Sequence, residues 1–372
     1  MKIVVAPDSF KESMSAIEAS EAIFEALDAY GIESVLTPLA DGGEGTLETL
    51  VSAMNGKIET YWVKGVRLEK RAVAVGYVDD IAIIECAKVC GLELLTEDQK
   101  NPYHTSTYGL GELILKALDH HVKKLMICLG GSATNDGGIG MMSALGVQFL
   151  DEHNKNVIPT MAGLAHIQTI DVSLLDERLK NVEIIGVCDV TNPLCGDNGA
   201  TYIYGGQKGV KQTEMATIDK AMKDYAKKVD EIYNYDYQNQ PGTGAAGGLG
   251  YALCAFCQAK LLPGFEVVSE IVELEKHIAK CDKVIVGEGK IDKQTQYGKT
   301  PYGVLKIAQK YHKDVFAFAG KVEDLDVLKA LGFKNVYAIS PEDMPLSMAL
   351  KKGKENLCQC VKAHMEDIKN EV

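Results

Sequence analysis

Nine consecutive residues, Gly130–Gly138, have the residue types of an anion-binding loop, because their sequence GGSATNDGG combines glycines with small hydroxyl and amide side chains. The apolar stretch 125–129 precedes them and residues 141–145 have a helical pattern, so the predicted order is strand, loop, helix. That order directs main-chain N–H groups and a helix N-terminus at an anion, and glycine leaves room for a phosphate group. We expect the phosphate contacts to come from Gly130, Gly131, Ser132, Thr134 and Asn135. A tight turn without a ligand is the alternative interpretation.

Carboxylates recur directly after the predicted strands, at the edge where open α/β sheets bind their ligands. They are Asp8, Asp41, Glu44, Asp189, Glu288 and Asp292. Phosphoryl transfer needs one or two carboxylates for Mg²⁺ and one that orients or deprotonates the acceptor hydroxyl. We assign the hydroxyl to Asp189 and a further catalytic role to Asp41, with Glu288 and Asp292 as the metal ligands. The residue types allow these roles to be exchanged, and each carboxylate taken singly could instead be a helix cap.

Lysines close to these loops could neutralise charge on the transferring group. The candidates are Lys11, Lys208, Lys290 and Lys299. Lys11 is the strongest, because it follows Asp8 and Ser9 directly after the first predicted strand. We assign Lys11 both a catalytic and a substrate-binding role, and Lys208 to the phosphate loop. Asp8, Ser9 and Asp41 complete the predicted substrate site, although a solvated surface lysine is the ordinary alternative for each cation.

Two glycine motifs that would indicate other nucleotide sites are incomplete. Gly298-Lys299-Thr300 ends like a P-loop, but residue 293, where the motif would start with glycine, is lysine. Gly242–Gly247 matches GxGxxG, but it follows Asn-Gln-Pro rather than a predicted strand. A hydroxy-acid oxidoreductase with a nucleotide cofactor, the competing enzyme class, therefore lacks its fingerprint.

Other nucleophiles and metal-binding residue types show no supporting pattern. Cys254–Cys257 is a CxxC pair without a second pair or a neighbouring histidine, and the sequence contains neither HExxH nor GxSxG. The ten cysteines mostly fall inside apolar runs, which is typical of free thiols in a reducing compartment. Zinc, redox and serine-hydrolase chemistry are therefore not predicted.

Alternating strands and helices must position the loops at the two ends of the chain. Predicted strands of this kind lie at 3–6, 35–39, 284–286, 315–319 and 336–339. Ser15 and Glu18 form a capping box that opens the first helix, and Thr300 is the expected N-cap of a helix whose first residue is Pro301. Between these parts the pattern changes, because residues 72–78 and 81–86 are typical of an antiparallel hairpin.

We therefore predict an α/β fold with two domains. Residues 1–57 and 275–372 would form a flavodoxin-like, doubly wound parallel sheet domain, and residues 58–274 a second α/β domain inserted after its second βα unit. Open α/β sheets bind ligands at the carboxyl ends of their strands and at domain interfaces. The active site is expected between the two domains.

Composition excludes several classes of partner. The net charge of −13 repels a nucleic-acid backbone, and the lysines and arginines form no dense basic stripe. No apolar run approaches the roughly 18 residues of a membrane span, and the first apolar run is too short for a signal peptide. We expect a cytoplasmic protein with a small-molecule substrate, no nucleic-acid partner and no membrane partner.

Several stretches together resemble the bacterial glycerate kinases of the glycerate 2-kinase type. They are APDSFKESMSA (6–16), PLADGGEGT (38–46), GLGELI (109–114), GGSATNDGGIG (130–140), CDVTNPLCGDNGA (188–200), PGTGAAGGLG (241–250) and GEGKIDKQTQYGKTP (287–301). The resemblance implies ATP-dependent phosphorylation of D-glycerate to 2-phosphoglycerate, with Mg²⁺, by a two-domain α/β protein. One departure is Gly206, which replaces the proline of the family's YGPQKGA segment and frees a backbone torsion there.

The residues leave some alternatives open. A kinase that forms 3-phosphoglycerate, or a non-catalytic protein that binds an organic acid, would use similar loops. The Gly130–Gly138 loop could hold either the phosphates of the nucleotide or the phosphate arriving on glycerate. The sequence does not set the oligomeric state.

Overall fold

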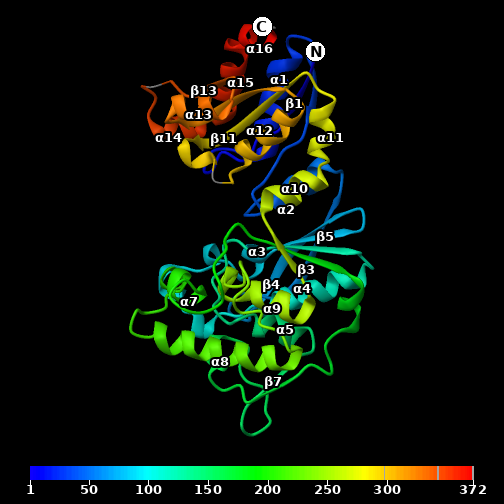
Figure 1. Ribbon diagram of the computed structural model, residues 1–372, viewed down its shortest axis with the longest axis vertical. Coiled ribbons are helices and arrows are strands. Elements are labelled where there is room, and N and C mark those ends of the chain that lie inside the picture. Colours follow the sequence, from blue (N-terminus) through cyan, green and yellow to red (C-terminus); the bar gives the residue numbers. More distant parts are fainter. Residues whose placement is uncertain (297, 342, 371–372) are drawn as a thin grey trace. The chain divides into compact units, whose positions relative to one another are not determined.

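The chain has a mixed α/β fold with parallel sheets and forms two compact units (Figure 1). The structure is a computed structural model, and it describes residues 1–296, 298–341 and 343–370. The first unit contains Met1–Asp41, Glu48–Asn55 and Phe265–Val372, and the second contains Gly42–Leu47 and Gly56–Gly264. The loop after the second strand is therefore divided, because Asp41 belongs to the first unit and Gly42–Leu47 to the second.

The first unit is built on a five-stranded parallel sheet with the strand order β13-β12-β11-β1-β2. Its strands are β1 (Lys2–Val5), β2 (Glu33–Leu36), β11 (Lys283–Ile291), β12 (Asp314–Val322) and β13 (Asn335–Ala338). The helices are α1 (Ala16–Asp28), α10 (Gly264–Ile271), α11 (Leu274–Ala279), α12 (Thr300–Lys310), α13 (Leu325–Leu331), α14 (Leu346–Lys351), α15 (Gly353–Ala363) and α16 (Met365–Lys369), and α2 (Thr46–Ala53) begins in the Gly42–Leu47 segment. Residues 315–319 of β12 are all buried, with Phe316 and Phe318 in the core that contains residues of α1 and α15. Burial on both faces explains why this part of the strand is continuously apolar.

Each of the five strands expected for this part of the chain is present, and the capping box of α1 is confirmed. The Ser15 hydroxyl accepts a hydrogen bond from the Glu18 amide, and the Glu18 carboxylate accepts one from the Ser15 amide. The expected N-cap of α12 is wrong by one residue, because Lys299 occupies that position. Thr300 is the first helical residue and donates its hydroxyl to Asp8 instead.

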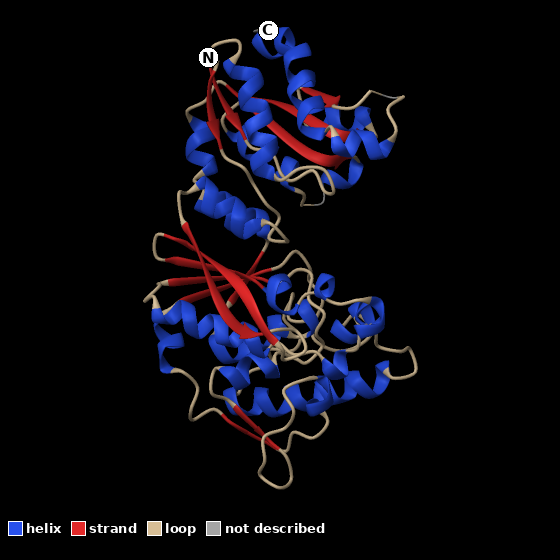
Figure 2. Cartoon of the chain, turned by 180° about the vertical axis from the view of Figure 1, so that it is seen from behind, coloured by secondary structure: helices blue, strands red, loops and turns tan. Residues whose placement is uncertain are grey.

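The second unit contains a six-stranded sheet with the order β10-β9-β6-β5-β4-β3 (Figure 2). Its strands are β3 (Lys57–Lys64), β4 (Lys70–Val78), β5 (Ile81–Glu85), β6 (Lys124–Cys128), β9 (Glu183–Val187) and β10 (Lys260–Leu262), and β7 (Gln148–Leu150) pairs with β8 (Thr169–Asp171) in a separate ribbon. The helices are α3 (Cys86–Cys90), α4 (Tyr108–Asp119), α5 (Ile139–Ala144), α6 (Met161–Leu164), α7 (Ala200–Tyr204), α8 (Met215–Tyr233) and α9 (Leu249–Cys257). Its short 3₁₀ helices are η1 (Leu92–Leu94), η2 (Glu97–Gln99), η3 (Pro102–His104), η4 (Glu177–Asn181), η5 (Gly206–Lys208) and η6 (Ala245–Gly247), whereas η7 (Lys293–Gln296) lies in the first unit. The predicted hairpin is confirmed, because β4 pairs with β5 in antiparallel register, whereas β5, β6, β9 and β10 run parallel.

Aromatic side chains fill the core beneath the sheet of the second unit. Tyr225 of α8 and Tyr251 of α9 pack edge to face at 5.7 Å between ring centroids, and Tyr225 meets Phe149 in the same way. The Tyr251 hydroxyl donates to Asp230, so the buried ring keeps a polar partner. Within the described residues no helix combines the length and the apolar character needed to cross a membrane.

Candidate functional site

The Gly130–Gly138 loop leaves the carboxyl end of β6, as expected, and only its first part is open to solvent. Gly130 and Gly131 are exposed, whereas the remaining residues of the loop are buried. Gly131 has φ +73°, a left-handed conformation that favours glycine. Among the described residues, the N–H groups of these two glycines have no hydrogen-bond partner. Two adjacent unpaired amides at a strand end are suited to bind an oxyanion.

Thr134 and Asn135 face the interior of the second unit. Both residues are fully buried, and the Asn135 amide donates to the Thr201 hydroxyl at 3.0 Å. The Oγ1 atom of Thr134 and the Oδ1 atom of Asn135 have no partner among the described residues. This burial does not support a direct contact between these side chains and a phosphate group, although both residues were expected to make one.

Lys208 of η5 supports the same loop from inside the protein. The residue is 3 % exposed, and its ammonium group donates to the Ser132 hydroxyl at 2.9 Å and to the Thr134 carbonyl at 2.7 Å. Burial lowers the pKa of Lys208 to about 8. The lysine therefore fixes the loop at Ser132 and Thr134. Its positive charge lies against the same loop that carries the exposed amides and would favour a bound anion there.

Asp189 and Glu85 lie at the same edge of the sheet as the glycine loop. β9 pairs with β6 so that Val187 is opposite Cys128, the last residue of β6. The glycine loop and Asp189 therefore follow the carboxyl ends of two neighbouring strands. Asp189 is exposed and accepts a hydrogen bond from the Gly264 amide at 2.9 Å. Glu85, at the end of β5, is 1 % exposed and accepts the Leu47 amide at 2.9 Å. The carboxyl ends of three neighbouring strands thus each carry a polar group.

The Gly42–Leu47 segment packs against this edge. A Cβ atom on Gly42 would lie 2.3 Å from Cγ1 of Val187, and one on Gly130 would lie 3.6 Å from Cα of Gly43. Glycine is therefore required at Gly42 for the close approach, and the two glycine-rich segments meet within the second unit. Glu44 forms an ion pair with Lys88 of α3 at 3.2 Å.

A second polar cluster lies in the first unit, where β1 and β11 run side by side. Asp8 is 8 % exposed, and its carboxylate accepts the Thr300 hydroxyl at 2.5 Å and the Ser9 amide at 2.6 Å. Burial, and next the negative charge of Asp41, raise the pKa of Asp8 to about 7. Lys11 is exposed and lies 3.9 Å from the Asp41 carboxylate. The structure thus brings together all four residues assigned to the substrate: Asp8, Ser9, Lys11 and Asp41.

Each of the two proposed metal ligands forms an ion pair with a lysine. Glu288 accepts Lys299 at 2.9 Å through Oε1, while its buried Oε2 has no partner in the described part of the chain. Burial raises the pKa of Glu288 despite that ion pair. Burial acts to raise the pKa of Asp292 as well, but Lys290 at 3.0 Å and the Gln294 amide outweigh it, and the pKa is lowered.

These carboxylates fit Mg²⁺ better than a metal held by protein ligands alone. No group of three or more histidine, cysteine, aspartate or glutamate residues in the described ranges could hold a metal ion. Mg²⁺ usually keeps several waters and takes one or two carboxylates together with substrate phosphates. The unsatisfied Oε2 of Glu288 is an oxygen that could serve in this way.

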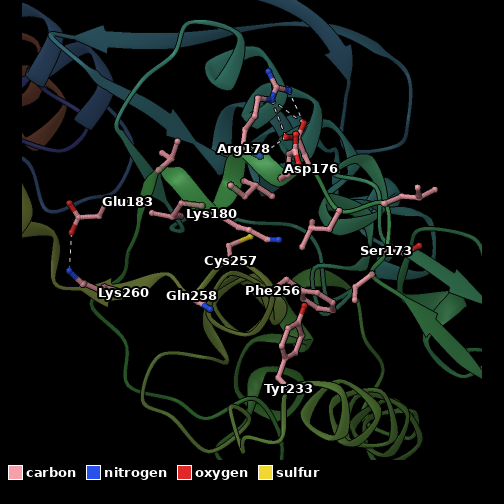
Figure 3. A pocket seen from close by; sticks show the side chains of 17 residues that line it. Ser173, Asp176, Arg178, Lys180, Glu183, Tyr233, Phe256, Cys257, Gln258 and Lys260 are labelled. Carbon is pink, nitrogen blue, oxygen red and sulfur yellow. Dashed lines mark hydrogen bonds and ion pairs between the residues drawn. The ribbon is translucent and has the colours of Figure 1, made fainter.

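One cavity is not part of either cluster. It has a volume of about 920 Å³ and is lined by residues at the start of β9 and β10 or shortly before them, including Glu183, Gln258 and Lys260 (Figure 3). Because β6, β9 and β10 run parallel, this cavity lies at their amino ends, whereas the glycine loop and Asp189 follow the carboxyl ends. This cavity therefore lies at the opposite end of the strands from the candidate site.

The backbone of the loop yields a first prediction at Gly138, the N-cap of α5. Gly138 has φ +76°, and a Cβ atom there would lie 2.4 Å from Cβ of Ala252. Gly138→Ala is expected to lower the free energy of unfolding by roughly 2 to 4 kcal/mol, from the left-handed conformation and from overpacking. Urea denaturation followed by circular dichroism measures the change.

Gly196→Ala is the matched control for Gly138→Ala. Gly196 lies in the same unit with φ +88°, but a Cβ atom would meet nothing within 4 Å. The control should lose only the conformational part, about 1 kcal/mol. Equal losses for the two variants would contradict the steric assignment at Gly138.

Several site residues escaped the sequence interpretation. Glu85 is the last residue but one of the predicted strand 81–86, close to where the other candidates lie, and that position could have identified it. Asp136 and Thr300 were not assigned site roles, because their partners, Thr107 and Asp8, are distant in sequence. No local pattern signals such a contact.

Comparison with known proteins gives one consistent result. The family model described as "Glycerate kinase family" matches residues 3–369. Glycerate 2-kinase of Escherichia coli (strain K12) is 42 % identical over 364 residues, which cover 96 % of each chain. Glycerate kinase of Bacillus subtilis (strain 168) is 42 % identical over 360 residues, 95 % of this chain and 94 % of the relative. A crystal structure from Salmonella typhimurium LT2, described as a glycerate kinase 2, superposes with a TM-score of 0.91 at 40 % identity, over 99 % of this chain and 98 % of that one.

Proposed function

The chain belongs to the glycerate kinase family, and we propose that it transfers the terminal phosphoryl group of ATP to D-glycerate, with 2-phosphoglycerate as the product. The family match extends from residue 3 to residue 369 and therefore includes both units. The structural observation that carries the proposal is the pair of exposed amides at Gly130 and Gly131, which have no partner among the described residues and lie next to a loop segment held by buried Lys208. This arrangement suits a phosphate chain.

In this proposal the nucleotide phosphates bind to the start of the glycine loop. Gly130 and Gly131 donate their amides, and Ser132 and Lys208 hold the loop in shape through their hydrogen bond. The main chain of Thr134 and Asn135 completes the loop, while their side chains pack inside. Preorganised donors of this kind stabilise charge without rearranging during the reaction.

Glycerate is assigned to the cluster in the first unit. Lys11 is exposed and would pair with the glycerate carboxylate or with the transferring phosphoryl group. Ser9 and the carboxylates of Asp8 and Asp41 would bind the glycerate hydroxyl groups. Asp41 is also assigned to the catalytic group, because it lies beside Lys11.

Asp189 orients the acceptor hydroxyl. The glycerate oxygen forms a bond to the γ-phosphorus as the bond from that phosphorus to the β–γ bridging oxygen breaks, and the electron pair leaves with ADP. The hydroxyl proton passes to the Asp189 carboxylate. The hydrogen bond from the Gly264 amide holds this carboxylate in one orientation.

Glu288 and Asp292 would hold Mg²⁺, with Glu288 Oε2 as the oxygen that has no other partner in the described residues. When bound, Mg²⁺ neutralises charge on the phosphates. The lysines at Glu288 and Asp292 keep both carboxylates in place.

We also propose that the first unit is a flavodoxin-like, doubly wound domain. In chain order its strands are arranged 2-1-3-4-5, because β11, β12 and β13 follow β2 after the second unit. The proposal is supported by this strand order, by the buried faces of β12 and by the carboxylates at the strand ends.

The proposal is tested by adding ATP, Mg²⁺ and D-glycerate and following the reaction by ³¹P nuclear magnetic resonance. We expect ADP and a phosphomonoester whose coupling to a single proton on C2 identifies 2-phosphoglycerate. Coupling to the two protons on C3 would identify 3-phosphoglycerate and correct the product. Binding of glycerate without any transfer would identify a non-catalytic organic-acid-binding protein.

A further inference from the structure

Asp136 is a buried carboxylate within the glycine loop that the mechanism above does not use. It is fully buried, and its two oxygens accept four hydrogen bonds. Oδ2 accepts the amide and the hydroxyl of Thr107 at 3.0 and 2.8 Å and the Gly140 amide at 3.4 Å. Oδ1 accepts the Gly138 amide at 3.0 Å. Burial raises the pKa of Asp136, and these donors oppose that shift.

These hydrogen bonds join the starts of two helices. Thr107 is the N-cap of α4 and Gly138 is the N-cap of α5, and neither helix has a side-chain cap of its own. The Thr107 hydroxyl also accepts the Met141 amide at 2.8 Å, so a single network satisfies amides at both helix starts. Unsatisfied N–H groups at buried helix ends are costly, and the carboxylate removes that cost for both helices.

Lys208 provides the matching anchor at the other side of the loop. It binds Ser132 and the carbonyl of Thr134, whereas Asp136 binds the residues from Gly138 onward. The two buried charges do not share a hydrogen bond in the described structure. Burial lowers the pKa of Lys208, and the negative charge of Asp136 is among the effects that oppose this lowering. The loop is thus held on both sides, and among its exposed residues Gly130 and Gly131 have amides without a hydrogen-bond partner in the described structure.

We infer that Asp136 is a positioning residue for phosphate binding: by tying the loop to the start of α4, it sets the direction in which the Gly130 and Gly131 amides point. The inference rests on the proposed function, because it assumes that phosphate binds at these amides. It adds a residue whose effect on the reaction is exerted through the loop rather than through contact with substrate.

Asp136→Asn tests the inference with a minimal change of shape. An amide can accept hydrogen bonds through one atom only, so its NH₂ group would face the donors of either Thr107 and Gly140 or Gly138. The resulting displacement of the loop is expected to lower kcat/KM for ATP by about 100-fold, the effect of a misplacement of roughly 1 Å. Affinity for ADP and for inorganic triphosphate, measured by isothermal titration calorimetry, should fall by at least about tenfold through the same displacement.

Asp230→Asn is the structural control. Asp230 is a partly buried carboxylate of the second unit that accepts the Tyr251 hydroxyl and the Tyr237 amide and has no hydrogen bond to the loop among the described residues. It should lose stability, measured by thermal denaturation, but bind triphosphate and ADP as the unmodified chain does. If a folded Asp136→Asn variant also bound both ligands normally, the positioning role would be wrong.

Thr107 provides a second test if Asp136→Asn fails to fold. Thr107→Val removes one donor to Asp136 and the acceptor for Met141, and should weaken triphosphate binding, whereas Thr107→Ser keeps the hydroxyl and should restore it. Normal binding by a folded Thr107→Val variant would overturn the inference. The proposed function is tested separately, by measuring turnover of the unmodified chain. If that chain were inactive but its triphosphate binding still depended on Asp136, the kinase reaction would be refuted and the positioning role of Asp136 would stand.

Discussion

Asp189→Asn is expected to lower kcat by about 1,000-fold, within the range for losing a group that accepts a proton in the transition state. Asparagine has nearly the same shape and retains an oxygen for the Gly264 amide, so the local fold should persist. It cannot take the hydroxyl proton of glycerate. The KM for ATP should change little, because the nucleotide is assigned to the Gly130–Gly138 loop. Steady-state kinetics at saturating glycerate separate the two parameters.

The control for Asp189→Asn is Asp80→Asn. Asp80 precedes β5 at the opposite edge of the same sheet, where it pairs with Lys123 at 2.8 Å. This variant should retain the kcat of the unmodified chain. If Asp189→Asn retained its turnover as well, the acceptor hydroxyl would have to be oriented by another carboxylate, and Asp41 would be the next candidate.

Asp8→Asn is expected to remove a pH dependence of about 4 kcal/mol from the free energy of unfolding of the ligand-free chain. Burial and the charge of Asp41 raise the pKa of Asp8 from 3.8 to about 7, so the folded chain binds this proton more tightly than the unfolded chain. The contribution of Asp8 to stability is therefore full below about pH 4 and is lost as the pH rises through about 7. The stability of the variant should fall less over that range.

Urea denaturation between about pH 4 and pH 8, with a chelator present, measures this difference. Asp28→Asn is the control, because Asp28 lies at the exposed end of α1 in the same unit. That variant should follow the pH profile of the unmodified chain. Parallel profiles for Asp8→Asn and the unmodified chain would show that Asp8 titrates normally.

Local sequence patterns were sufficient for most of the elements that carry the site. The apolar runs predicted the five strands of the first unit and the β4–β5 hairpin, because alternation and turn residues act over a few positions. The capping box of α1 is equally local, since its two residues are three positions apart. The glycine loop was recognised for the same reason, as a strand, a loop and a helix in succession.

Residue types and spacing thus predicted which loops would carry chemistry, and the resemblance of seven ordered segments indicated the family that the comparisons then showed. Tertiary structure decided which atoms of those loops face solvent. The buried Asn135 amide donates to Thr201, and the buried ammonium group of Lys208 donates to the loop carbonyl of Thr134. Thr300 does not cap its helix but donates its hydroxyl to Asp8, which is 292 positions away in the sequence. Such contacts depend on which strands become neighbours in a sheet. A buried polar group is stable only where a residue on a neighbouring element supplies its hydrogen-bond partner, and a local sequence pattern does not contain that information.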